Sequence, residues 1–204
     1  MSSSGQEIEA KFYAQDLGRI QTRLQGLDSH LVQSRVLETN IRFDLPGARL
    51  RAEGRVLRLR RDTAVRLTYK SASKEEEGVL SREEIEFIVE DFEKAKRFLE
   101  ALGYQKLVYY EKYRATYELN ETLIMLDELP YGNFVEIEGE NIKAIRASAQ
   151  QLHLNMEVAV ATSYHALFER ARKALNLSFQ DISFANFADI KVDATDLGVQ
   201  PADS

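Results

Sequence analysis

Residues 55–71 read RVLRLRRDTAVRLTYKS, and this stretch decides the fold. Apolar and charged side chains alternate along it in two runs, Arg55 to Asp62 and Val65 to Ser71. Side chains two apart in a β-strand point to the same face, so each run predicts a strand with one apolar and one charged face. The charged faces carry Arg58, Arg60, Arg66 and Lys70.

The same alternation recurs along the chain. Further strands are expected at Glu7 to Ala14, Arg35 to Leu45, Arg82 to Val89, Gln105 to Leu119, Thr122 to Leu129 and Asn133 to Glu138. Helices are expected at Leu17 to Leu27, Asp91 to Leu102, Ile142 to Leu152 and Ser163 to Leu175. Asp91 is the expected N-cap and Gly103 the stop of the second helix, and SASKEEEG, residues 71–78, is expected to form an exposed turn. Eight strands without βαβ alternation predict an α+β chain with antiparallel pairing.

The charged faces admit two interpretations. One strand taken alone fits an antiparallel sheet with a solvent-exposed face. Six strands, however, place charges at successive same-face positions, and like charges so close repel unless opposite charge lies between them. An eight-stranded β-barrel supplies that arrangement, because it closes its edges around an interior that holds side chains or one small ligand. The apolar faces would then point outward, under the helices.

Composition sets further bounds. The 204 residues are 44% hydrophobic and 29% charged, as in ordinary globular proteins, and we expect one domain over residues 1–192 with a disordered tail over 193–204. There is no cysteine, so any metal must be held by oxygen or imidazole. The net charge of -6 argues against a nucleic-acid surface. No apolar segment resembles a signal peptide or a transmembrane helix, so a cytoplasmic protein without a membrane partner is expected.

A set of motifs carries a family resemblance. EIEAK, at Glu7 to Lys11, fits an ExExK signature, and LRLR, LTYK, REEIE, KYR, LDELP and FVEIEG follow in order between Leu57 and Gly139. With these motifs the chain resembles the CYTH proteins, named for class IV adenylyl cyclases and thiamine triphosphatases and also called triphosphate tunnel metalloenzymes. The resemblance spans roughly residues 5 to 190 and implies a triphosphate bound with divalent metal inside the barrel.

The resemblance assigns roles to single residues. It implies that the triphosphate is contacted by Lys11, Arg58, Arg60, Lys70, Arg82, Lys112 and Arg114. It implies that Mg²⁺ or Mn²⁺ is held by Glu7, Glu9, Asp127, Glu136 and Glu138. Glu7, Glu9, Lys11 and Lys70 are the expected catalytic residues. Glu84 and Glu86 could contact either the triphosphate or the metal. Arg42 and Arg66 are further candidates, because each lies on the charged face of its strand.

The implied chemistry is metal-assisted attack at phosphorus. Hydrolysis of tripolyphosphate or a related triphosphate is favoured, because conversion of ATP to cyclic AMP and pyrophosphate also requires a positioned ribose. A non-catalytic sensor of polyphosphate or nucleotide is the alternative of another class. The absence of Trp makes thiamine triphosphate a less favoured substrate, because Trp is the best stacking partner for its rings. His30, His153 and His165 lack metal-ligand spacing and are expected to be surface or partly packed residues, and the apolar outer faces could support a homodimer.

Overall fold

The computed structural model describes residues 6–76 and 79–203, and antiparallel strands dominate it. The strands are β1 (Gln6–Ala14), β2 (Ser29–Asp44), β3 (Val56–Arg61), β4 (Val65–Lys70), β5 (Lys74–Glu76), β6 (Val79–Val89), β7 (Gln105–Leu119), β8 (Thr122–Leu129) and β9 (Gly132–Gly139). The helices are α1 (Leu17–Gly26), α2 (Arg49–Ala52), α3 (Phe92–Ala101), α4 (Ile142–Gln151), α5 (Tyr164–Ala174) and α6 (Ala194–Leu197), with a 3₁₀ turn at Met156–Val158.

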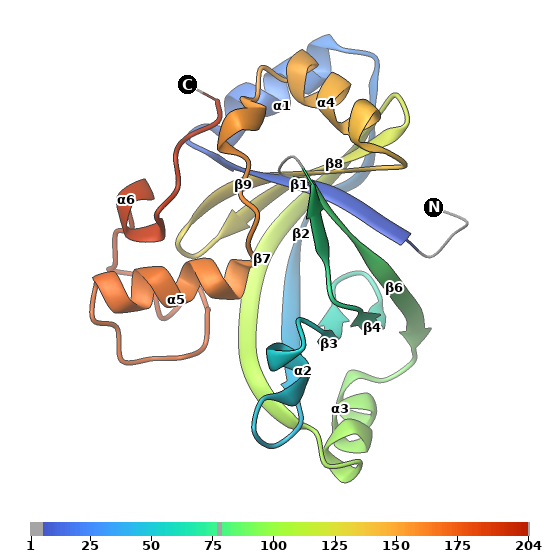
Figure 1. Ribbon diagram of the computed structural model, residues 1–204, viewed down its shortest axis with the longest axis vertical. Helices are drawn as coiled ribbons and strands as arrows, with labels where there is room; N and C mark the ends of the chain where they lie inside the picture. Colours follow the sequence, from blue (N-terminus) through green and yellow to red (C-terminus); the bar gives the residue numbers. More distant parts are fainter. Residues whose placement is uncertain (1–5, 77–78, 204) are drawn as a thin grey trace.

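Eight of these strands close a ring. Hydrogen bonds link them in the order β1-β9-β8-β7-β2-β3-β4-β6, and β1 pairs again with β6. Strand β6 closes the ring because it pairs with β4 over residues 84–89 and with β1 over residues 80–83. The expected α+β architecture with an eight-stranded antiparallel barrel is therefore confirmed, and β5 is an additional short strand on β6 (Figure 1).

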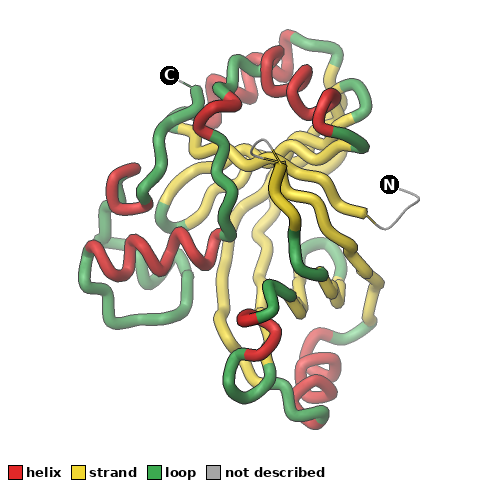
Figure 2. Tube along the Cα trace, in the orientation of Figure 1, coloured by secondary structure: helices red, strands yellow, loops and turns green. Residues whose placement is uncertain are grey.

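The apolar strand faces point outward and are covered by helices, as the alternation predicts. Ala10, Phe12 and Ile137 belong to a core that α1 and α4 cover. A second core joins Leu59 to α3. The core under α5 is different, because its Val108 lies on the same face of β7 as Lys112 and Arg114. Figure 2 shows these helices outside the layer of strands. The charged faces are thereby left to the interior of the ring.

Local signals in the sequence set the helix boundaries. The Asp91 carboxylate accepts a hydrogen bond from the Lys94 amide at 2.9 Å, which caps α3 as predicted. Gly103 follows this helix with a φ of 92°, a left-handed conformation that glycine adopts without a Cβ penalty. Ser163 caps α5 in the same way, and this fixes where Tyr164 and His165 enter the helix. The cap of α5 matters because these two side chains reach the cavity.

Two expectations about irregular segments need correction. The residues expected to form a disordered tail contain α6, and Ala202 is buried. The reason is specific pairing, since the Asp203 carboxylate accepts hydrogen bonds from the amides of Gln15 and Asp16. The expected turn at residues 71–78 includes β5, and residues 77–78 lie outside the described residues.

Strand β2 starts at Ser29, six residues before its predicted start. Register shifts interrupt its pairing with β7 near Gln33 and explain why alternation did not reveal this part. No helix within the described ranges is long and apolar enough to cross a lipid bilayer.

Candidate active site

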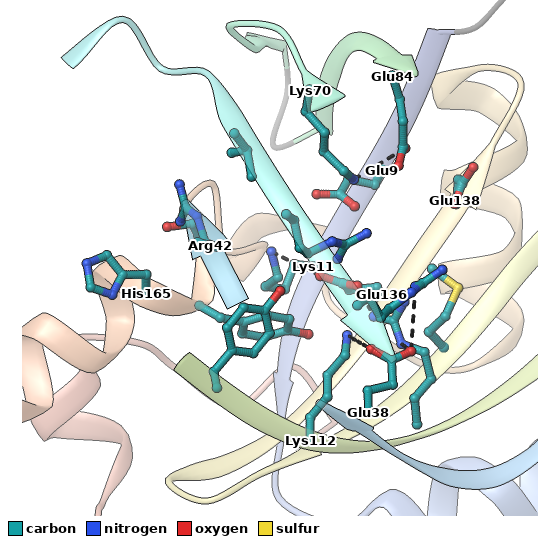
Figure 3. A pocket seen from close by; sticks show the side chains of 18 of the residues that line it. Glu9, Lys11, Glu38, Arg42, Lys70, Glu84, Lys112, Glu136, Glu138 and His165 are labelled. Atoms are coloured by element: carbon teal, nitrogen blue, oxygen red, sulfur yellow. Dashed lines mark hydrogen bonds and ion pairs between the residues drawn. The ribbon is translucent and has the colours of Figure 1, made fainter. Parts of the chain in front are cut away.

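The charged inner face of the ring encloses a cavity of about 690 Å³ (Figure 3). Among the described residues, eleven Lys and Arg side chains line it: Lys11, Arg42, Arg51, Arg55, Arg58, Arg60, Arg66, Lys70, Arg82, Lys112 and Arg114. The seven described Asp and Glu side chains in its lining are Glu9, Glu38, Asp62, Glu84, Glu86, Glu136 and Glu138. A chain of net charge -6 thus surrounds this cavity with a local excess of cations.

A buried ion network forms the floor of the cavity on β2, β7 and β8. The Lys112 ammonium lies 2.9 Å from the carboxylate of Asp127, which also receives a two-pronged contact from Arg114. Glu38 lies 3.6 Å from Lys112 and 3.6 Å from Arg60. Although burial alone raises the pKa of Glu38, Lys112, Arg114 and Arg60 bring it down to about 2. Glu38 therefore stays ionised at neutral pH.

Lys11 on β1 joins this floor from the opposite side. Its ammonium lies 3.2 Å from Glu136 of the neighbouring β9 and donates a hydrogen bond to the carbonyl of Thr162. Burial lowers the pKa of Lys11, but Glu136 and Glu9 more than compensate and raise it. Burial likewise raises the pKa of Glu136, but Lys11, Arg114 and Lys112 hold it well below its ordinary value. Both partners are therefore charged.

The far wall comes from β3, β4 and β6. Cross-strand register places Arg60 directly opposite Arg66, a repulsive arrangement by itself. Glu86 lies between them, 3.2 Å from Arg60 and 3.6 Å from Arg66, and it accepts a hydrogen bond from Thr68. Glu86 thus supplies the negative charge that is needed between the two neighbouring arginines of this wall.

A pair of carboxylates faces the cavity from β1 and β9. Glu9 and Glu138 are direct cross-strand partners, so two like charges lie on adjacent strands. Arg82 reaches Glu9 at 3.6 Å, and Lys70 reaches Glu84 at 3.3 Å on the next wall. Among residues 6–76 and 79–203 no preassembled group of three His, Asp or Glu donors is present. The carboxylate oxygens of Glu9 and Glu138 nevertheless fit a hard divalent cation, provided that substrate oxygens complete its coordination.

The cavity brings together nearly all of the residues singled out from the sequence. Asp127 is the exception, because it is fully buried beneath Lys112 and Arg114 and does not line the cavity. Its carboxylate is occupied by these cations and by the Tyr164 hydroxyl at 2.7 Å. For Glu7 the structure describes the backbone, opposite Arg82, while its side chain lies outside the described part. The individual roles of these residues stay predictions.

Several residues of the cavity were not singled out from the sequence. Glu38 carries a signal that could have revealed it, since it has the same strand parity as Arg42. Arg51 comes from the short helix α2, where alternation gives no information. Arg55 and Asp62 flank β3, and Asp62 shares the parity of Arg58 and Arg60 in the predicted strand. Tyr164 and His165 begin α5 and reach the cavity only because the chain folds back after β9. His165 is accordingly a cavity residue as well as the partly packed residue expected.

Tyr164 holds the floor of the cavity together. Its ring lies beneath the ammonium groups of Lys11 and Lys112, at 4.6 Å and 5.3 Å from the ring centroid. Phe134 packs against the same ring edge-on, with centroids 5.1 Å apart. Burial and the charges of Asp127 and Glu136 raise the pKa of Tyr164 well above its ordinary value. The phenol is therefore a neutral donor at physiological pH.

Comparison with known proteins agrees with this geometry. The CYTH domain family matches residues 5–164, so the chain belongs to the CYTH domain family. No curated protein matches the chain.

Solved structures share the fold. A candidate adenylate cyclase from Vibrio parahaemolyticus has a TM-score of 0.70 at 21% identity, over 81% of this chain and 99% of that chain. The PH1012 protein of Pyrococcus horikoshii has a TM-score of 0.67 at 26% identity, over 78% and 96%. A candidate adenylyl cyclase from Hippeastrum, described as having a dominant triphosphatase activity, has a TM-score of 0.59 at 20% identity, over 80% and 95%.

Proposed function

We propose that this protein is a divalent-metal-dependent triphosphatase that hydrolyses the terminal phosphoanhydride bond of a triphosphate held in the cavity. One observation carries the proposal, namely the convergence of eleven described Lys and Arg side chains on one partly open cavity of about 690 Å³. Such a cavity matches an anion with many oxygens, because side-chain cations can surround it from every wall. The triphosphatase activity described for the Hippeastrum protein is consistent with this choice.

Binding would proceed by exchange of ion partners. Lys11, Lys112 and Arg114 are paired with carboxylates in the resting site, and phosphate oxygens would take over part of this pairing. The carboxylates keep the cations in position, so little rearrangement is needed when the substrate enters. Lys70 and Arg82 act in the same way from the opposite walls.

The reaction is an in-line displacement. The oxygen of a water molecule forms a bond to the terminal phosphorus as the bond from that phosphorus to the bridging oxygen breaks. The diphosphate part leaves with the bridging oxygen, the attacked phosphorus becomes orthophosphate, and the water proton passes to solvent. Arg114, Lys112 and Lys11 neutralise the charge that develops on the phosphate oxygens. Glu9 and Glu138, with Glu7 as a further predicted ligand, would hold a divalent cation, which would supply Lewis acidity toward those oxygens.

Adenylyl cyclase activity is the second candidate. The observation that favours it is an uncharged part of the lining, where Val36, Leu123 and Met125 could hold an organic substituent. In this reaction the ribose 3′-hydroxyl of ATP attacks the α-phosphorus and pyrophosphate leaves.

Product analysis tests the proposal directly. Purified protein is incubated with tripolyphosphate, ATP or thiamine triphosphate and with Mg²⁺ or Mn²⁺, followed by phosphate assay and nucleotide chromatography. Orthophosphate release from tripolyphosphate is the expected result. Cyclic AMP and pyrophosphate from ATP would replace the proposal by the cyclase, and binding without any product would favour a sensor.

A carboxylate substitution tests the metal site. Glu9→Gln keeps the shape of the side chain but removes its charge, and we expect metal-dependent turnover to fall by more than about a hundredfold. Glu93→Gln, an exposed position on α3, is the matched control and should keep full activity. Equal metal dependence in Glu9→Gln and the wild type would remove Glu9 from the metal site.

A further inference from the structure

The Lys and Arg side chains of the cavity differ in whether a carboxylate lies within ion-pair distance of them. Lys11, Arg60 and Lys112 each lie within ion-pair distance of a carboxylate, and the same is true of Arg58, Arg66, Lys70, Arg82 and Arg114. Within the described part of the chain, no carboxylate lies at such a distance from Arg42 or Arg51. These two cations thus have no ion-pair partner in the lining of the cavity. Glu169 of α5, whose pKa is lowered chiefly by Arg172 and also by Arg51, is the carboxylate that interacts with this group at longer range.

Like charges surround Arg42. Its direct cross-strand partner on β3 is Arg58. Burial lowers the pKa of its guanidinium, Tyr110 raises it in part, and Arg58, Arg82 and Arg51 lower it further. Its Nε atom is buried and has no hydrogen-bond partner. A guanidinium in this position gains both charge compensation and a hydrogen bond when an anion arrives.

His165 lies beside these arginines, at the end of the cavity covered by α5. In Figure 3 its ring and Arg42 lie together, away from Glu9, Glu84 and Glu138. Both ring nitrogens of His165 are buried without a hydrogen-bond partner. Burial, followed by Arg42 and Arg51, lowers the pKa of His165 to about 4, so the neutral imidazole offers one N–H donor at pH 7.

We propose that Arg42, Arg51 and His165 form a separate oxyanion subsite at the α5 end of the cavity, which binds a single phosphate group. The ligand is either free orthophosphate or the end of a phosphate chain. The proposal rests on the proposed function only for the choice of phosphate as the oxyanion.

This subsite differs from the rest of the cavity in whether a phosphate must displace a carboxylate to bind. A phosphate that binds at Lys112 or Arg60 must displace or share a carboxylate already paired with the cation. A phosphate that binds at Arg42 and Arg51 displaces none, and it also relieves the repulsion between Arg42 and Arg58. The subsite is therefore the favoured first anchor for a phosphate group that enters the cavity.

Equilibrium binding of inorganic orthophosphate tests the subsite without any need for turnover. Isothermal titration with EDTA present should show one phosphate site in the wild type and at least about tenfold weaker binding in Arg42→Met. Arg49→Met is the matched control, because Arg49 is an exposed arginine of α2 outside the cavity lining. It should bind phosphate as the wild type does, and Arg42→Lys should retain most of the affinity.

Thermal unfolding distinguishes a binding role from a structural one. Since Arg42→Met removes a positive charge that lies among arginines, its Tm without phosphate should equal or exceed that of the wild type. The rise in Tm that phosphate produces in the wild type should be lost. Tripolyphosphate in EDTA then identifies the source of the group: weaker binding in Arg42→Met assigns the subsite to a chain end, and unchanged binding assigns it to free orthophosphate. Wild-type affinity for orthophosphate in Arg42→Met, or no phosphate binding by the wild type, would overturn the subsite.

Discussion

Replacing Glu38 by Gln should reveal how strongly the ion network stabilises the fold. The Glu38 side chain is 3% exposed and lies within ion-pair distance of Lys112, Arg60 and Arg114. Despite burial, these cations shift its pKa from 4.5 to about 2. A shift of roughly 2.5 pKa units corresponds to about 3 kcal/mol of stabilisation. Gln keeps the volume of the side chain but leaves three buried cations short of one negative charge.

The pH dependence follows from the direction of the shift. A carboxyl group whose pKa is lower in the folded state stabilises the protein above its unfolded pKa of 4.5, and this stabilisation disappears as the pH falls towards 2. The wild type should therefore exceed Glu38→Gln by about 3 kcal/mol in free energy of unfolding at pH 7, and by about half of that at pH 3.

Urea unfolding followed by circular dichroism at both pH values measures this difference. Glu128→Gln is the matched control, because Glu128 forms an exposed ion pair with Arg35 and should contribute less than about 1 kcal/mol. Equal urea midpoints for Glu38→Gln and the wild type at pH 7 would refute the reasoning. A difference that stays constant between pH 7 and pH 3 would refute it as well, because it would have a cause other than the charge.

Two further substitutions test contacts that link distant segments. Tyr164→Phe removes the hydrogen bond to Asp127 but keeps the ring under Lys11 and Lys112, so we expect a loss of about 1–3 kcal/mol in urea unfolding and a lower kcat with little change in KM. Preserved stability and kcat would show that the hydroxyl is dispensable. Asp203→Ala removes the acceptor for two amides near the start of α1 and should lower the free energy of unfolding by about 1–2 kcal/mol. An unchanged urea midpoint would show that these two hydrogen bonds do not stabilise the fold.

Much of the candidate site could be predicted from alternation along the strands. Arg58, Arg60 and Lys70 line the cavity because their strand parity is opposite to that of apolar residues packed under helices. The period of two residues in a strand makes this assignment independent of which strands are neighbours. Glu38 could have been added in the same way, because it shares the parity of Arg42 within the predicted strand Arg35 to Leu45 and no register shift separates the two residues.

The sequence by itself determined the strands, their charged faces and the helix caps, because these depend on residues close together in the chain. Only the tertiary structure decided which charges meet. It placed Asp127 beneath Lys112 and Arg114, where a carboxylate orients cations, although the family resemblance implied a metal ligand at this position. It also brought Tyr164 and His165 to the cavity and paired Asp203 with the start of α1. The contact between Gln15 and Asp203 joins residues 188 positions apart. The energy of all these contacts depends on distance and burial, which no local pattern contains.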